Sequence, residues 1–146
     1  GYLTAKLLRT KIKDIWLYII VGGVWGIWHL PYYLFFLPHS AMHEILPVGR
    51  LLFAIISIVT MVCWSVMFIE LYRLTKSIWP VVLLHVVEDS LINHLIIDGH
   101  TIIVSGREIF VSPVIGIMAS VLYICVGVIL RRNRIIKEHK SGQTGT

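Results

Sequence analysis

Four long apolar runs follow one another along the chain, and short polar segments separate them. Each run has about 20 residues or slightly more, enough to cross the ~30 Å hydrocarbon core of a bilayer at about 1.5 Å per residue. The pattern therefore predicts an all-α integral membrane bundle with about four transmembrane helices. The predicted spans are Ile15–Leu37, Leu51–Leu71, Ile78–Ile97 and Ile109–Leu130.

The polar segments at the two ends of the chain predict smaller features. Charged and apolar residues interleave between Lys6 and Lys13, which is typical of an interfacial helix that leads into the first span. The last ten residues, 137–146, are polar, and we expect them to be frayed. The chain is thus interpreted as one membrane domain over residues 1–135 and a polar cytoplasmic tail over residues 136–146.

Composition agrees with this interpretation. The chain is 57% hydrophobic and 14% charged, with a mean hydropathy of +0.82, whereas a soluble domain carries about 25% charged residues. It has neither a glycine-rich phosphate loop nor a basic patch interleaved with aromatic residues, so we expect no nucleic acid partner. Cys63 and Cys125 lie in apolar runs without a CxxC spacing, which predicts buried, reduced side chains.

Positive charge is distributed unevenly around the predicted spans. Eleven lysines and arginines flank the spans on the side that holds both chain ends, and only Arg50 and Arg107 lie on the other side. Cytoplasmic segments carry the excess of Lys and Arg in membrane proteins. The sequence therefore predicts a multi-pass protein of the cell membrane, in contact with the lipid bilayer, with both ends cytoplasmic.

Three ionisable side chains lie close together in the third span: His85, Glu88 and Asp89. Positions three and four apart share a helix face, so both carboxylates are expected beside the imidazole. An ionisable group in a bilayer costs at least about 2.5–3.5 kcal/mol, which favours a function over simple insertion. The structural alternative is a buried polar pair that joins two helices.

A second candidate is His29, in the first span. Trp25 lies one turn before it, Trp28 is its neighbour, and Pro31 follows. Proline cannot donate a backbone N–H and can bend the helix, which redirects nearby side chains. A lone intramembrane histidine is often only a packing donor, so this local context strengthens the functional interpretation.

The residues alone fit three chemistries. A carboxylate base with two histidines can hydrolyse a bond, His and Asp can bind zinc or iron, and His29 with His85 can ligate haem. No Ser or Cys lies in an obvious nucleophile context, which disfavours covalent catalysis. Straight helices would leave His29 and His85 about 10 Å apart in depth.

Three short motifs occur in order around these residues. Trp25-xxx-His29 is followed by Leu-Pro, His85-xxx-Asp89 is preceded by Trp-Pro, and the chain begins with Gly-Tyr-Leu. The first two resemble the second motif (FxxxH) and the third motif (HxxxN or HxxxD) of the CAAX protease and bacteriocin-processing family of intramembrane endopeptidases. Gly-Tyr-Leu is similar to the segment that follows the first motif of that family, EExxxR.

The resemblance implies an all-helical intramembrane endopeptidase that hydrolyses a peptide bond with activated water. It implies a peptide or protein substrate, prenylated for the Ras-converting members, and bacteriocin maturation or self-immunity for bacterial members. Its implied catalytic residues are His29, His85 and Asp89, with the histidines stabilising the oxyanion or placing the water; Trp25 and Glu88 are secondary candidates. A glutamate-type mechanism needs no cofactor, and zinc bound by the two histidines is the alternative.

The first motif itself has no match in this sequence. In the family its glutamate activates water, and its arginine would immediately precede Gly1. We therefore interpret the chain as the C-terminal part of a protease domain, without peptidase activity by itself. Two alternatives stay open: a non-enzymatic membrane immunity or scaffold module, and a haem- or metal-binding membrane protein that uses His29 and His85.

Overall fold

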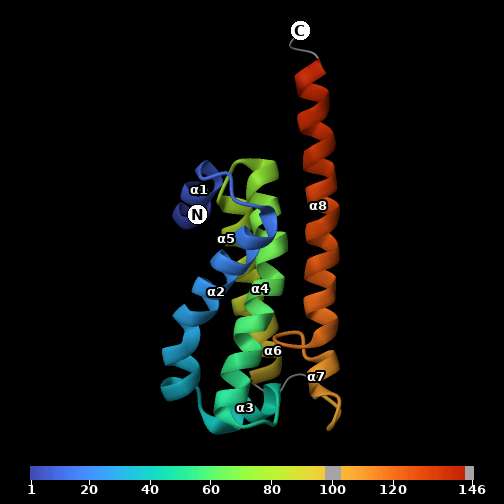
Figure 1. Cartoon of the computed structure of the whole chain (residues 1–146). Coiled ribbons are helices and arrows are strands. Elements are labelled where there is room, and N and C mark those ends of the chain that lie inside the picture. The colour runs from blue at the N-terminus through green and yellow to red at the C-terminus, as the bar shows by residue number, and fades with distance from the viewer. Residues whose placement is uncertain (98–102, 144–146) are drawn as a thin grey trace.

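The computed structural model describes residues 1–97 and 103–143, and within these residues every regular element is a helix (Figure 1). The all-α prediction is therefore confirmed. The first half of the chain forms α1 (Tyr2–Arg9), α2 (Asp14–Pro31), the π-helix η1 (Tyr32–Phe36), α3 (His39–Ile45) and α4 (Arg50–Thr75). The second half forms α5 (Trp79–Val87), the π-helix η2 (Glu88–Asn93), α6 (His94–Ile97), α7 (Glu108–Val111) and α8 (Ile117–Gln143).

The first two predicted spans correspond to helices of the right kind. Asp14–Phe36 and Arg50–Thr75 are long and apolar enough to cross a membrane. The third predicted span is also helical, but it is divided into α5, η2 and α6, because the helix widens to π geometry from Glu88 onward. The two polar residues expected beside His85 therefore lie where the helix changes its geometry, a common location for functional sites.

The fourth predicted span, Ile109–Leu130, begins in the wrong place, because its first residues do not form one continuous helix with the rest. Helix α7 ends before Pro113, and α8 does not begin until Ile117. Proline has no N–H to donate and disfavours the helical conformation of the residue before it. At its other end α8 continues to Gln143, so the tail expected to be frayed is helical up to that residue.

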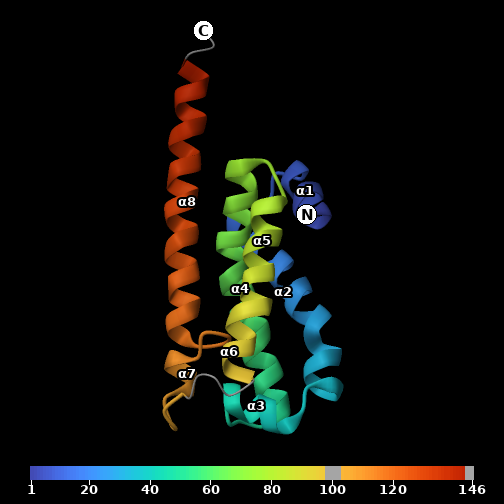
Figure 2. The same cartoon turned by 180° about the vertical axis from the view of Figure 1, so that it is seen from behind.

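Helix α4 lies at the centre of the bundle. It packs against α2 on one side and α8 on the other, and α5 also contacts it (Figures 1 and 2). Helix α8 extends beyond the bundle at its C-terminal end in both views. Helix α2 is tilted relative to α4, and the short helix α3 closes the opposite end of the bundle.

Two glycines allow the close contact between α2 and α4. A Cβ at Gly22 would come within 2.5 Å of the Val62 Cα, and one at Gly26 within 2.9 Å of the Ile58 Cα. Both distances are too short for any larger residue without a shift of the backbone. Gly23 has nothing within 4 Å of such a Cβ, so it does not contribute to the close approach. Small residues at such positions are a general device for packing membrane helices.

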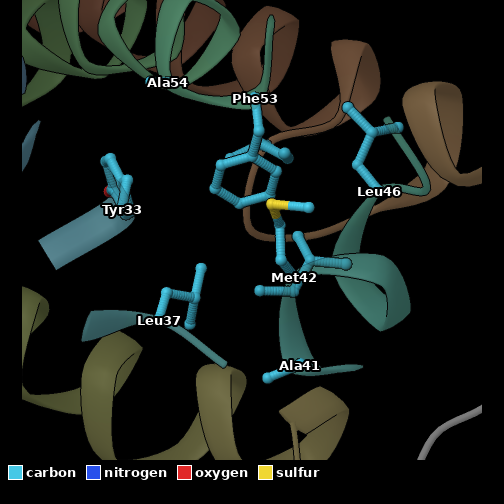
Figure 3. Close-up of a cluster of buried hydrophobic side chains, with 9 residues drawn as sticks. Tyr33, Leu37, Ala41, Met42, Leu46, Phe53 and Ala54 are labelled. Carbon is cyan, nitrogen blue, oxygen red and sulfur yellow. The ribbon is translucent and has the colours of Figure 1, made fainter. Parts of the chain in front are cut away.

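The main apolar core lies at the end of the bundle that α3 closes. Figure 3 shows Met42 of α3 beside Phe53 of α4, and both side chains are almost fully buried. Tyr33 and Leu37 complete this side of the cluster. Arg50 donates hydrogen bonds to the carbonyl oxygens of these last two residues at 2.8 and 3.0 Å. It thus satisfies backbone groups that the end of η1 leaves without helical partners.

An ionic network joins α2, α4 and α8 at the other end of the bundle. At its centre Glu70 has no exposed surface and accepts hydrogen bonds from Tyr18 at 2.7 Å, Arg73 at 3.0 Å and Arg134 at 2.7 Å. The network comprises Asp14, Tyr18, Glu70, Arg73, Arg131, Arg134 and Glu138.

The outer members of this network bind the three helices to one another. Asp14 at the start of α2 accepts bonds from Arg73 at 2.8 Å and from Arg131 at 2.9 Å. Burial alone would lower the pKa of Arg134, but its hydrogen bonds to Glu70 and Glu138 outweigh this effect and raise the pKa above its usual value. Arg134 therefore stays charged at any ordinary pH. The network also brings basic residues of α4 and α8, predicted on the same side of the membrane, to one end of the bundle.

The outer surface of the bundle is strongly apolar. Trp28 is 80% exposed, Phe35 79% and Trp79 68%. Contiguous apolar surface on this scale is unfavourable in water and is typical of a surface that faces lipid or another protein. Cys125 of α8 is also exposed, which corrects the expectation that both cysteines are buried; on a lipid-facing helix, outward thiols need no polar partner.

Candidate active site

The site is built around His85, in the last turn of α5. Its Nδ1 lies 3.7 Å from Oε2 of Glu88, and its Nε2 lies 3.4 Å from Oδ2 of Asp89. The imidazole thus has one carboxylate near each ring nitrogen, which confirms that the three residues share a face. The two carboxylates differ in environment, because Glu88 is 5% exposed while the side chain of Asp89 is 56% exposed.

His29 reaches the same region from α2. Its Nδ1 lies 2.8 Å from the carbonyl oxygen of Trp25, one turn earlier. A carbonyl can only accept, so Nδ1 must carry the proton. Because this bond occupies Nδ1, the other ring nitrogen of His29, Nε2, is the one that can contact a ligand. The imidazole also stacks on Tyr33, with ring centroids 5.8 Å apart.

Trp25 lies between the two histidines. Its ring centroid is 6.2 Å from that of His29 and 5.3 Å from that of His85, with edge-on geometry in both pairs. Phe68 of α4 packs against the indole at 5.3 Å. Trp25 is therefore a spacer that fixes the separation of the imidazoles rather than a source of acid–base chemistry.

Both histidines line one cavity of about 270 Å³, together with Glu88 and Asp89. The depth difference expected for straight helices does not separate them, since α2 is tilted relative to α4 (Figures 1 and 2) and tilt shortens the depth gained per residue. The structure thus brings together all the candidates that the sequence indicated. The cavity wall contains His29, His85, Glu88 and Asp89, and Trp25 packs against the two histidines.

Helix α8 supplies a residue that the sequence did not indicate. Tyr123 donates a hydrogen bond from its hydroxyl to Oε1 of Glu88 at 3.0 Å. Its ring stacks on Trp64 of α4, with centroids 4.5 Å apart and planes within 10°. The available signal was a phenol in the middle of an otherwise apolar run, but nothing in the sequence relates it to a residue 35 positions earlier.

Three buried polar atoms around this cavity have no hydrogen-bond partner among the described residues: Nε1 of Trp64, Nδ1 of His85 and Oε2 of Glu88. Buried polar groups are paired in the great majority of cases, and an unpaired one calls for an explanation. All three residues line the cavity. A donor and an acceptor facing one small space can orient a water molecule or a peptide carbonyl.

No group of three or more His, Cys, Asp or Glu among the described residues is arranged to hold a metal ion. The polar wall instead offers two imidazoles and two carboxylates, which is a donor set suited to acid–base chemistry.

A second cavity, of about 220 Å³, lies on the other side of His85 and Trp25. Its wall is mainly apolar and comes from α1, α2, α4 and α5. Phe68, Val81 and Val82 are among its lining residues. His85 lines both cavities, so the polar and the apolar space meet at its imidazole.

The bundle and its polar cavity define a helical membrane protein with a histidine–carboxylate site in its interior. The family model of Type II CAAX prenyl endopeptidase Rce1-like proteins matches residues 1–91. The chain belongs to this family. The match covers α1 to α5 and includes His29, His85, Glu88 and Asp89, whereas Tyr123 and all of α8 lie outside it.

Membership in this family implies a protease, hence a hydrolase that acts on a protein or peptide. No curated protein and no solved structure matches the chain.

Proposed function

We propose that the polar cavity is the active site of a CAAX-type intramembrane endopeptidase, which hydrolyses a peptide bond with activated water. The observation that carries this proposal is the position of His85, between two carboxylates and on the same cavity wall as His29. Unpaired buried atoms at this wall supply the groups that a water molecule and a peptide carbonyl need.

The catalytic residues are His29, His85 and Asp89. The Nε2 of His29 and the imidazole of His85 face the reacting carbonyl, where they stabilise the oxyanion or hold the water. Asp89 contacts His85 at 3.4 Å and strengthens its imidazolium form. Glu88 and Trp25 are positioning residues, since Glu88 faces Nδ1 of His85 and Trp25 separates the two rings.

The apolar cavity behind His85 supports a substrate that carries a prenyl group. A prenyl chain needs an apolar space, and the peptide bond to be cleaved directly follows the modified cysteine, because the last three residues of a CAAX sequence are removed. The arrangement of one apolar and one polar cavity on the two sides of His85 suits both parts of such a substrate. In this proposal the protein spans the bilayer several times, with both ends cytoplasmic.

Alanine substitutions at the two histidines test the catalytic proposal. In membranes that contain the full-length protein, His85→Ala and His29→Ala are each expected to lower kcat/KM for a farnesylated peptide by about 10²–10⁴-fold, the usual range for general acid–base groups. His39→Ala, on the exposed face of α3, is the matched control and keeps full activity. Unchanged cleavage in both site variants would contradict a catalytic role for this cavity.

A cavity-filling pair tests the substrate class. Val82→Phe narrows the apolar cavity and is expected to raise KM for the farnesylated peptide with little change in kcat. Val86→Phe is the control, because Val86 lies one turn further along α5, is 50% exposed and lines neither cavity. Equal KM values for farnesylated and unmodified peptides would contradict a prenyl-binding role while leaving peptide hydrolysis intact.

A further inference from the structure

A third cleft, of about 330 Å³, lies between the end of α4 and α8, far from the histidines. Its volume falls within the range of about 300–1,000 Å³ that is usual for small-ligand sites. Four of the six side chains that line it are basic. The lining residues are Arg73, Leu74, Lys76, Arg134, Lys137 and Glu138.

The two arginines of this cleft are fixed in place. Arg73 and Arg134 both bind Glu70 of the ionic network, and their side chains are only 15% and 7% exposed. The ionic network has three arginines and three carboxylates, so it is formally neutral. Lys76 and Lys137 therefore add a formal charge of +2 to the cleft. Fixed guanidinium groups beside two lysines form a preorganised site for an anion.

The backbone at Lys76 has an unusual conformation for a lysine. Lys76 caps α4 in the left-handed conformation, with φ 56°. Glycine or asparagine usually occupies this position, since a Cβ makes the conformation costly. A lysine held in this conformation at the edge of a basic cleft is the kind of local strain that accompanies ligand sites.

The location of the cleft identifies the source of the anion. Arg50–Thr75 is long and apolar enough to cross a membrane, and the cleft begins where this helix ends. It therefore lies at the level of the lipid headgroups. Basic pockets between membrane helices commonly bind anionic headgroups.

We propose that this cleft binds the phosphate of an anionic phospholipid headgroup, with Lys76 and Lys137 reaching it beside the fixed arginines. The occupant recognised is a phosphate group with a net negative charge, and the lipid of the adjacent leaflet is its source. The proposal is independent of peptide hydrolysis, because none of these residues lines either cavity at His85.

Two lysine-to-glycine substitutions provide the test. Lys11 and Lys76 are the only non-glycine residues with positive φ in the described chain, and only Lys76 lines the cleft. Lys76→Gly and Lys11→Gly remove the same charge and relieve the same kind of backbone strain. The detergent-solubilised protein is titrated with phosphatidylglycerol, and bound lipid is counted by native mass spectrometry.

Lys76→Gly is expected to weaken phosphatidylglycerol binding about five-fold, the effect of roughly 1 kcal/mol per basic residue near an anionic surface. Its lipid-free thermal midpoint should be no lower than that of the parent protein, while Lys11→Gly binds as the parent does. Lys137→Gln should weaken binding to a similar degree. Equal binding by both glycine variants, or equal loss in both, would overturn the proposal.

Two further ligands distinguish the source of the phosphate. Phosphatidylcholine carries a phosphate but no net charge, and binding as tight as that of phosphatidylglycerol would contradict an anion site. Inorganic phosphate at millimolar concentration is the competitor from solution. If inorganic phosphate does not displace phosphatidylglycerol, the site is assigned to the lipid. If it displaces the lipid from the parent protein but not from Lys76→Gly, the phosphate chemistry is confirmed and the source is soluble.

Discussion

Two buried glutamates in this bundle have opposite surroundings. Glu70 in α4 is 0% exposed, and three donors bind its carboxylate. Glu88 in η2 is 5% exposed, but among the described residues Tyr123 alone donates to it, and its Oε2 has no hydrogen-bond partner there. Burial of either carboxylate costs desolvation free energy. Among the described residues, only the carboxylate of Glu70 has arginines at hydrogen-bond distance to offset this cost.

We infer from this difference that Glu70 has a structural role and that Glu88 serves the proposed site. At Glu70 every part of the charge is used to hold α2, α4 and α8 together. At Glu88 one oxygen is left to face His85 at 3.7 Å across the wall of the cavity. An incompletely paired buried charge is unfavourable for folding alone, and such groups concentrate at functional sites. We therefore expect substitutions at the two glutamates to affect different properties.

Glu70→Gln is expected to have the largest effect of these substitutions, on stability. It leaves Arg73 and Arg134 buried beside a neutral amide, and loss of one partner of a buried ion pair costs about 3–5 kcal/mol. Denaturant unfolding in detergent would measure this. Glu138→Gln is the control, because Glu138 also binds Arg134, at 3.1 Å, but is 57% exposed. If Glu138→Gln lowered the free energy of unfolding as much as Glu70→Gln, Glu70 would not be the structural centre of the ionic network.

Glu88→Gln is expected to affect catalysis instead. The amide keeps the shape and can still accept from Tyr123, but it no longer supports a positive charge on His85. We expect kcat/KM of the full-length protein to fall by about 100-fold, at the lower end of acid–base contributions, while the unfolding midpoint stays near that of the parent. Reduced stability without reduced turnover would place Glu88 with Glu70 as a structural residue.

The sequence predicted the parts of this molecule that depend on local spacing. The first two spans and the shared face of His85, Glu88 and Asp89 are both consequences of helical periodicity. Periodicity also places His29 one turn after Trp25. These relations act within a few residues, so they can be read from one segment at a time.

The relations that distinguish Glu70 from Glu88 are long-range, and the sequence did not predict them. Arg134 meets Glu70 across 64 positions, and Tyr123 meets Glu88 across 35. Both contacts depend on where α8 begins, and the break at Pro113 moves that start to Ile117. A periodic apolar run continues across this break, so hydropathy alone placed the fourth span too early.

Two tyrosines allow the smallest and most direct test of the comparison. Tyr18 donates to Glu70 at 2.7 Å and Tyr123 donates to Glu88 at 3.0 Å, so each Phe variant removes one hydroxyl from one glutamate. Tyr18→Phe should lower stability by about 1 kcal/mol and leave kcat/KM unchanged, because two arginines still bind Glu70.

Tyr123→Phe should lower kcat about ten-fold and shift its pH profile, because it frees the carboxylate that faces His85, while KM stays the same. Both effects come from the loss of a single hydrogen bond to a buried carboxylate, so any difference in readout reflects what the carboxylate does. If both variants lost only stability, Glu88 would be a second structural anchor and would have no part in the proposed chemistry at His85.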